Sequence, residues 1–212
     1  MYYVMRSGVP FALGQAMEAA GAAAVDCVER FGPDERFRPA FDAWHGRPRK
    51  VALRADEEEF ARVKGEEPCA VNRDVLICLP PRRRSERSAL LEALDPFTDA
   101  PRPRQQPEPP PDDVPAMRYV IRPGVMRTAG KAMAQAGHAA LMCVERYGDQ
   151  YKDRFDAWRE TGRRGELLTE GWERFRRDTE AVVVSDAGHT QVAPGTETVI
   201  ALVPSPRAGR RD

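Results

Sequence analysis

The chain lacks an excess of charge of either sign, and it has only four cysteines and three histidines. Its 212 residues include 33 basic and 33 acidic side chains, which leaves a net charge of zero. No strong overall field therefore directs it towards nucleic acid or membrane surfaces. The four cysteines show neither a CxxC motif nor a Cys/His spacing, so we expect no metal, no cofactor and no disulfide framework. Such cysteine usage is typical of a protein in a reducing cytoplasm.

Long hydrophobic runs are also absent, and so are several common catalytic signatures. No stretch is long enough to span a bilayer, so we expect no membrane partner. The apolar run Ala19–Val25 follows Glu18 and has a counterpart at Ala136–Val144, which favours a folded helix over a signal peptide. The sequence has no glycine-rich phosphate loop with the right spacing, no GxSxG and no HExxH, which argues against the enzyme classes built on those motifs.

The clearest feature that is present is an internal repeat. The segment GVMRTAGKAMAQAGHAALMCVERYG, which begins at Gly124, aligns without a gap with GVPFALGQAMEAAGAAAVDCVERFG, which begins at Gly8. We therefore predict a duplicated domain, with a degenerate copy at 1–95 and an intact copy at 117–212. The linker between them, at 96–116, holds eight of the 19 prolines and should be extended and semi-rigid.

Each copy is predicted to contain the same alternation of strands and helices. Hydrophobic period, turn residues and capping residues define the expected elements. In the first copy these are strands at 1–6, 50–55, 69–71 and 75–79 and helices at 14–30, 37–44 and 57–64. In the second copy they are strands at 117–122, 164–168, 182–184 and 199–203, the equivalent long helix, and a short helix capped by Thr169.

The two copies differ in two polar sets. Lys131, Gln135 and His138 on the second long helix have glutamine or alanine as counterparts in the first copy. Their i, i+4, i+7 spacing places all three on one side of the helix. The second copy also carries a polar hairpin tip, from Asp186 to Thr196, that the first copy lacks. Because both sets are missing from the same copy, we predict that they share a site.

Three residues of this predicted site are the catalytic candidates. Lys131 lies in the first turn of its helix, where a cation opposes the helix dipole but can receive an anion or a developing oxyanion. Asp186 directly follows a strand and could orient or deprotonate a water. Thr190 could hold the substrate or that water. The structural alternatives are a solvated lysine, a turn-forming aspartate and a β-forming threonine.

Further polar residues near these three are candidates for substrate binding: Gln135, His138, His189 and Gln191. His138 lies among alanines in the middle of the helix, which favours a core histidine or one that supports the site residues. His189 lies on the hairpin tip, which suits binding better than base catalysis. The chemistry that this set suggests is attack of water on an activated carbonyl.

Two segments of the second copy carry these residues in a characteristic order: GKAMAQAGHAAL at 130–141 and SDAGHTQVAPGTETVIALVP at 185–204. Together they resemble the type 2 peptidyl-tRNA hydrolases, the archaeal and eukaryotic kind. The resemblance implies that each copy is a three-layer α/β/α domain with a four-stranded mixed sheet, and that the copies pack as a pseudo-dimer in a monomeric chain. It implies peptidyl-tRNA as the substrate, cleaved at the ester to the 3′ ribose, with Lys131, Asp186 and Thr190 as the family's site residues.

Arginines on the expected short helix and its approach are candidates for binding tRNA phosphates: Arg163, Arg164, Arg174, Arg176 and Arg177. A solvated helix face is the alternative interpretation of this group. Two other functions stay open, namely a non-catalytic tRNA-binding or scaffold protein on the same fold, and hydrolysis of another acyl ester or amide. The presence of the catalytic set in one copy only favours the esterase.

Overall fold

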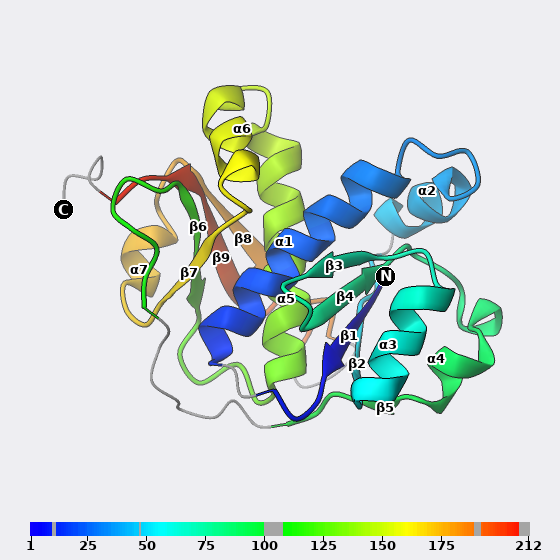
Figure 1. Ribbon diagram of the computed structural model, residues 1–212. Coiled ribbons are helices and arrows are strands. Elements are labelled where there is room, and N and C mark those ends of the chain that lie inside the picture. The colour runs from blue at the N-terminus through cyan, green and yellow to red at the C-terminus, as the bar shows by residue number, and fades with distance from the viewer. Residues whose placement is uncertain (10–11, 47, 100–107, 189–191, 208–212) are drawn as a thin grey trace.

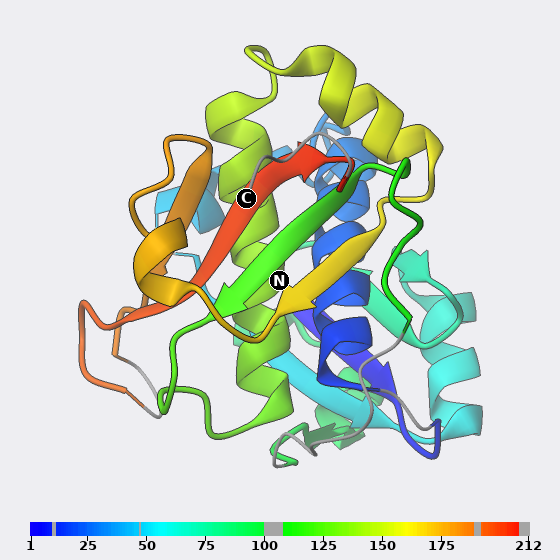
Figure 2. The same cartoon turned by 90° about the vertical axis from the view of Figure 1, so that its left-hand side faces the viewer.

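Two long helices lie between two mixed β-sheets (Figure 1). The computed structural model describes residues 1–9, 12–46, 48–99, 108–188 and 192–207. The helices are α1 (Leu13–Phe31) and α5 (Ala129–Tyr147). Figure 2 shows the second sheet in front of both helices, so each sheet packs one face against the same central helical layer.

The first sheet is built by the first half of the chain, in the order β3-β4-β1-β2-β5. Its strands are β1 (Tyr2–Arg6), β2 (Val51–Ala55), β3 (Ala70–Asn72), β4 (Leu76–Leu79) and β5 (Asp95–Pro96). Its remaining helices are α2 (Arg38–Gly46), α3 (Glu57–Glu66), the 3₁₀ turn η1 (Arg84–Glu86) and α4 (Ala89–Ala93). Strands β1 and β2 are parallel and the other pairs are antiparallel. Apolar residues of α3 and α4 cover the outer face of this sheet.

The second sheet is built by the second half, in the order β7-β6-β9-β8. Its strands are β6 (Ala116–Ile121), β7 (Gly165–Leu168), β8 (Ala181–Ser185) and β9 (Glu197–Ser205), and its short helices are α6 (Lys152–Glu160) and α7 (Trp172–Phe175). Strands β6 and β7 are parallel, and β9 is antiparallel to β6 and β8. The order and directions of β8-β9-β6-β7 therefore match those of β3-β4-β1-β2.

Two local expectations from the sequence are wrong. The first sheet has a fifth strand, because Asp95 and Pro96 pair with β2 where the linker was expected to begin. Thr169 does not cap the short helix of the second half. The N-cap is Gly171, at φ +89°, and α7 spans only four residues. A glycine tolerates this left-handed backbone, which lets the chain turn into a short helix that buries Trp172 and Phe175 against the sheet.

Small residues allow α1 and α5 to approach the sheet of the other half. A β-carbon on Gly21 of α1 would lie 1.9 Å from the hydroxyl of Tyr119, which belongs to β6. A β-carbon on Gly137 of α5 would lie 2.1 Å from the hydroxyl of Tyr3, which belongs to β1. Neither position can hold a larger residue without moving a buried tyrosine. The two halves therefore interlock through a reciprocal pair of contacts, and residues of both halves occupy each of the two central cores.

Candidate active site

The hairpin between β8 and β9 directs one carboxylate onto α5. Asp186 follows β8 directly, and its backbone is fixed on both sides: its N–H donates to Thr196 O at 2.8 Å, and its carbonyl accepts from Gly195 N at 2.7 Å. Lys131 Nζ and Gln135 Nε2 both donate to Asp186 Oδ2. Asp186 is buried and Gln135 is buried beside it, so the three side chains form a largely desolvated polar cluster.

Local backbone interactions hold the two sides of this cluster. Thr128 caps α5 by accepting from Lys131 N at 3.2 Å, which places Lys131 in the first turn of the helix. Gly188 N donates to the second carboxylate oxygen, Asp186 Oδ1, at 2.8 Å. Gly188 lies at φ +77°, and a β-carbon there would come within 2.5 Å of Pro194. A glycine is therefore needed at this turn. With Lys131 and Gln135 on Oδ2 and Gly188 on Oδ1, the carboxylate receives hydrogen bonds on both of its oxygens.

The carboxylate is ionised over the whole physiological range. Burial alone raises the pKa of Asp186, but the hydrogen bonds from Lys131 and from the Gly188 N–H outweigh it and hold the pKa below its ordinary value. A carboxylate with a lowered pKa is a weak base, although it remains a good acceptor for orienting a water. A cation beside it on a helix N-terminus suits the stabilisation of negative charge.

His138 lies one turn further along α5, next to the first half of the chain. It is partly buried, and its ring meets the ring of Trp44 edge-on at 6.3 Å. Its buried Nδ1 has no hydrogen-bond partner among the residues that the structure describes. Burial, together with the nearby charge of Lys50, lowers the pKa of His138 to about 3. The imidazole is therefore neutral at physiological pH.

The first half of the chain forms one wall of this region. Ala129, the first residue of α5, donates its N–H to Asp99 O at 2.8 Å, and a β-carbon on Gly130 would lie 2.1 Å from Phe97 O and 3.1 Å from Ala52. Lys50 directly precedes β2, and its charge interacts with Asp186 and Lys131. Sequence reasoning missed Lys50, because nothing in a copy without the polar set pointed to a contribution from that copy.

Comparisons with known proteins show the family of this chain. Residues 116–209 match the family model described as Peptidyl-tRNA hydrolase PTH2. A peptidyl-tRNA hydrolase of Pyrobaculum aerophilum is 38% identical over 101 residues, which cover 42% of this chain and 84% of the relative. The chain belongs to the peptidyl-tRNA hydrolase PTH2 family.

Other relatives carry the same name. A peptidyl-tRNA hydrolase of Halobacterium salinarum is 36% identical over 103 residues, with 43% of this chain and 89% of the relative covered. Peptidyl-tRNA hydrolase 2 of Saccharomyces cerevisiae is 31% identical over 119 residues, with 46% and 55% covered. The PTH2 family match lies in the second half of the chain, which contains Lys131, Gln135 and Asp186.

Three of the predicted site residues lie outside the described residues: Thr190, His189 and Gln191. The residues on either side of them, up to Gly188 and from Val192 onwards, are described. In the described ranges no group of three or more His, Cys, Asp or Glu side chains is arranged to hold a metal ion. Within the same ranges no helix is both long enough and apolar enough to cross a membrane.

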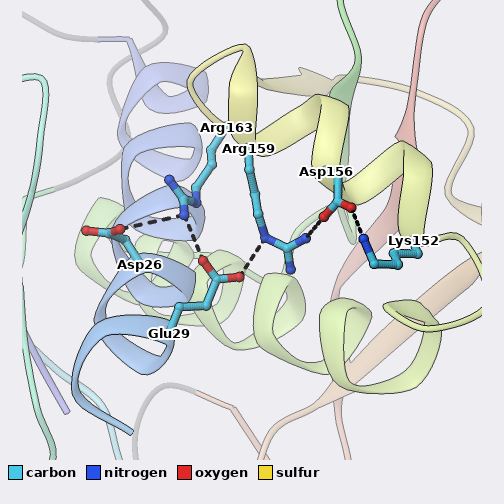
Figure 3. Close-up of polar contacts among 6 residues, drawn as sticks. All are labelled: Asp26, Glu29, Lys152, Asp156, Arg159 and Arg163. Atoms are coloured by element: carbon cyan, nitrogen blue, oxygen red, sulfur yellow. Dashed lines mark hydrogen bonds and ion pairs between the residues drawn. The ribbon is translucent and has the colours of Figure 1, made fainter. Parts of the chain in front are cut away.

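The arginines that were predicted to form one cluster lie in two groups. Arg163 and Arg164 precede β7 and bind carboxylates of α1. Figure 3 shows Arg163 between Glu29, at 2.7 Å, and Asp26, at 3.6 Å. Arg164 Nε donates to the buried Glu18 at 2.9 Å. These two side chains therefore join the second half of the chain to α1.

The second group lies beyond the other end of β7, on α7 and just after it. Its members are exposed: Arg174, Arg176 and Arg177. Arg174 lies over the ring of Phe175 at 5.2 Å, and Arg176 pairs with Glu197 at 2.6 Å. The split has a simple cause, because four strand residues separate the loop before β7 from the turn after it. Sequence proximity alone did not reveal that the two ends face different surroundings.

Proposed function

We propose that this chain hydrolyses peptidyl-tRNA, cleaving the ester between the peptide and the 3′ ribose and releasing free tRNA. The observation that carries the proposal is the contact of Lys131 and Gln135 with Asp186 in a chain of the PTH2 family. These residues come from the two segments that sequence analysis joined into one site. We place the enzyme in the cytoplasm, with no metal or other cofactor.

In the proposed mechanism the cluster prepares a water and receives the charge that its attack creates. Asp186 accepts a hydrogen bond from the water and orients it towards the ester carbonyl. Lys131, which donates to Asp186, supplies the positive charge that stabilises the tetrahedral oxyanion. Gln135 keeps the carboxylate in place, and Thr190 holds the water or the substrate. His138, uncharged, supports the helix face beside them.

The tRNA phosphates are proposed to lie over the exposed arginines on and after α7. Arg174 and Arg177 have the exposure that a phosphate contact needs, and Arg176 would exchange Glu197 for a phosphate. Arg163 and Arg164 are the weaker members of the predicted set, because a phosphate would have to displace the carboxylates of α1.

The test is incubation of the full chain with an N-blocked peptidyl-tRNA and, in parallel, with the matching aminoacyl-tRNA. We expect release of free tRNA from the peptidyl form, unchanged by EDTA, and little release from the aminoacyl form. Turnover that EDTA abolishes and a divalent ion restores would contradict the metal-free mechanism. Binding of tRNA without turnover would instead indicate a non-catalytic tRNA-binding protein.

We further propose that the chain is an internal pseudo-dimer of two duplicated domains, at 1–95 and 117–212, joined by the segment 96–116. Two observations support this proposal: the shared strand order of the two sheets, and the reciprocal contacts of Gly21 with Tyr119 and of Gly137 with Tyr3. Once the second subunit is tethered, one intact site is enough for activity.

A fragment that begins at Ala116 tests the pseudo-dimer. Without the first half, α5 loses its packing against α1, β1 and β2, which exposes a large apolar face. We expect the fragment to be insoluble, to melt at a lower temperature, or to dimerise with itself, as size-exclusion chromatography with light scattering would show. A monomeric fragment as stable and active as the full chain would contradict the proposal.

A further inference from the structure

Equivalent positions of the two halves hold Lys50 and Gly165, and comparing them shows where the side chain of Lys50 points. Trp44 Nε1 donates to Arg49 O at 2.7 Å, and Trp158 Nε1 donates to Arg164 O at the same distance. The residue after each of these carbonyls lies at the start of a strand that pairs in parallel with the first strand of its half. Lys50 directly precedes β2, and Gly165 is the first residue of β7. Lys50 in the first half therefore corresponds to Gly165 in the second.

Gly165 reveals the direction of the side chain at this position. A β-carbon on Gly165 would lie 3.0 Å from the Cβ and Cγ of Glu18, which belongs to α1. The residue of α5 that corresponds to Glu18 is Ala134, as the gapless alignment of the two helices shows. The side chain of Lys50 is therefore directed at α5 beside Ala134, between the turns that carry Lys131 and Gln135.

The charges around Lys50 agree with this direction. Asp186 and Lys131 act on it from the hairpin and from α5, and His138 feels its charge from the next turn of α5. The α-amino group of Met1, which donates to Arg49 O at 3.2 Å, also interacts with the charge of Lys50. Burial lowers the pKa of Lys50 to about 7 despite the attraction of Asp186. A partly buried lysine whose pKa is lowered in this way contributes little as a structural ion pair.

We infer that Lys50, supplied by the first half of the chain, contacts the substrate in the Lys131–Asp186 site and provides a second positive charge for its anionic oxygens. The inference rests on the proposed hydrolysis of peptidyl-tRNA. Two anionic oxygens fit this chemistry, the oxyanion of the tetrahedral intermediate and the phosphate next to the 3′-terminal ribose. In this arrangement Lys131 remains on Asp186, and Lys50 receives the substrate from the opposite wall. The half that lacks the catalytic set then completes the site of the other half.

Steady-state kinetics of full-length variants test this role. Lys50→Met keeps the aliphatic stem and removes the charge, and we expect kcat/KM to fall at least about tenfold, as for the loss of one charged contact to a substrate. Lys50→Arg should recover most of the activity. The matched control is Arg49→Met, which removes an exposed cation from the neighbouring residue and should leave kcat/KM unchanged. A fall in kcat assigns Lys50 to the oxyanion, and a rise in KM assigns it to the phosphate.

A second readout separates a substrate contact from a structural role. Unfolded lysine titrates near pH 10.4, so between pH 7 and 10 the unfolded chain binds more protons than the folded one, and stability rises with pH over that range. Replacing Lys50 by methionine should therefore keep or raise the melting temperature at pH 7. If Lys50 had a structural role instead, the same replacement would lower the melting temperature. NMR of isotope-labelled lysine side chains should show one midpoint near pH 7, which Asp186→Asn moves downwards.

Three results would overturn the role of Lys50: an active chain in which Lys50→Met matches the wild type, an equal loss in Arg49→Met, or a Lys50 midpoint that ignores Asp186→Asn. An inactive wild-type chain is a different failure, because it contradicts the proposed function itself. In that case the NMR titration still shows whether Lys50 and Asp186 face each other, so the two failures are distinguishable.

Discussion

The two central helices carry opposite charges where they meet their own hairpins. On α5 the cation Lys131 lies on the helix and the carboxylate Asp186 lies on the hairpin. On α1 the carboxylate Glu18 lies on the helix, and the cation Arg73 lies on the turn between β3 and β4, at 2.6 Å. The same architecture therefore holds an ion pair of one polarity in the second half and of the reverse polarity in the first.

The surroundings of the two carboxylates explain why one suits chemistry and the other suits structure. Glu18 is 4% exposed, and it accepts from both terminal nitrogens of Arg73, from Arg164 Nε and from the N–H of Gly165. Its donors come from both halves, so the ion pair joins the halves. Asp186 accepts hydrogen bonds from Lys131, Gln135 and Gly188 of its own half, and its charge interacts with that of Lys50 from the first half. Because the oxygens of Glu18 are taken by donors from both halves, little room is left for a water.

Removing the cation of the second half, Lys131, should have the largest effect on activity. Lys131→Ala should lower kcat/KM by roughly 100-fold or more, because the oxyanion loses its donor and Asp186 loses its partner. The matched change in the first half is Gln15→Ala, at the equivalent position of α1, which should stay within a few-fold of the wild type. Both are measured as release of tRNA from peptidyl-tRNA, after circular dichroism has shown that the fold is intact. Equal damage from the two variants would mean that the active half has been assigned wrongly.

Much of the fold could be predicted because it depends on local signals. The two long helices, the capping box formed by Asp56 and Glu59, and the strands of both halves follow from hydrophobic period and from capping and turn residues. The association of Lys131, Gln135 and Asp186 was predicted from a comparison of the two halves, since the polar residues of the helix and the hairpin occur together in only one of them. The structure brings these three side chains into contact.

The parts that sequence reasoning missed depend on contacts between distant segments. Strand β5 is two residues long and forms only because β2 offers a free edge. The wall around Lys50 and the partners of Arg163 and Arg164 come from the packing of one half on the other. No period or spacing in one half contains that information, because it depends on how the helices cross. The start of α7 was misplaced for a local reason, since a glycine at positive φ replaced the expected cap.

The contacts of Gly21 and Gly137 with tyrosines of the other half can be tested through the free energy of unfolding. Gly137→Ala and Gly21→Ala each place a methyl group within about 2 Å of a buried tyrosine hydroxyl, and overpacking of this kind costs about 2–3 kcal/mol of unfolding free energy. Gly65→Ala in α3 is the control, because nothing lies within 4 Å of its β-carbon, and alanine should stabilise that helix by up to about 1 kcal/mol. Urea denaturation measures all three. If Gly137→Ala behaves like Gly65→Ala, the halves are not held in register by these contacts.

The smallest expected effect concerns the inverted ion pair itself. Glu18→Gln keeps the shape of the side chain and the hydrogen bond from Gly165, but it removes the charge that Arg73 and Arg164 share. Hydrogen bonds to charged groups contribute about 1.5–3 kcal/mol each. Here both arginines are partly exposed, at 42% and 31% of their side chains, and regain water, so we expect a loss of only about 1–2 kcal/mol in urea denaturation.

Turnover distinguishes a structural ion pair at Glu18 from an active site. Glu18→Gln should leave kcat/KM within about twofold while the free energy of unfolding falls. Lys64→Ala, which breaks an exposed pair with Asp74, is the control for charge removal in the first half and should change neither quantity. If Glu18→Gln lowers turnover as much as Lys131→Ala without unfolding the chain, then the first half has kept chemistry of its own. The reversed polarity would in that case mark a second active site rather than a structural joint between the halves.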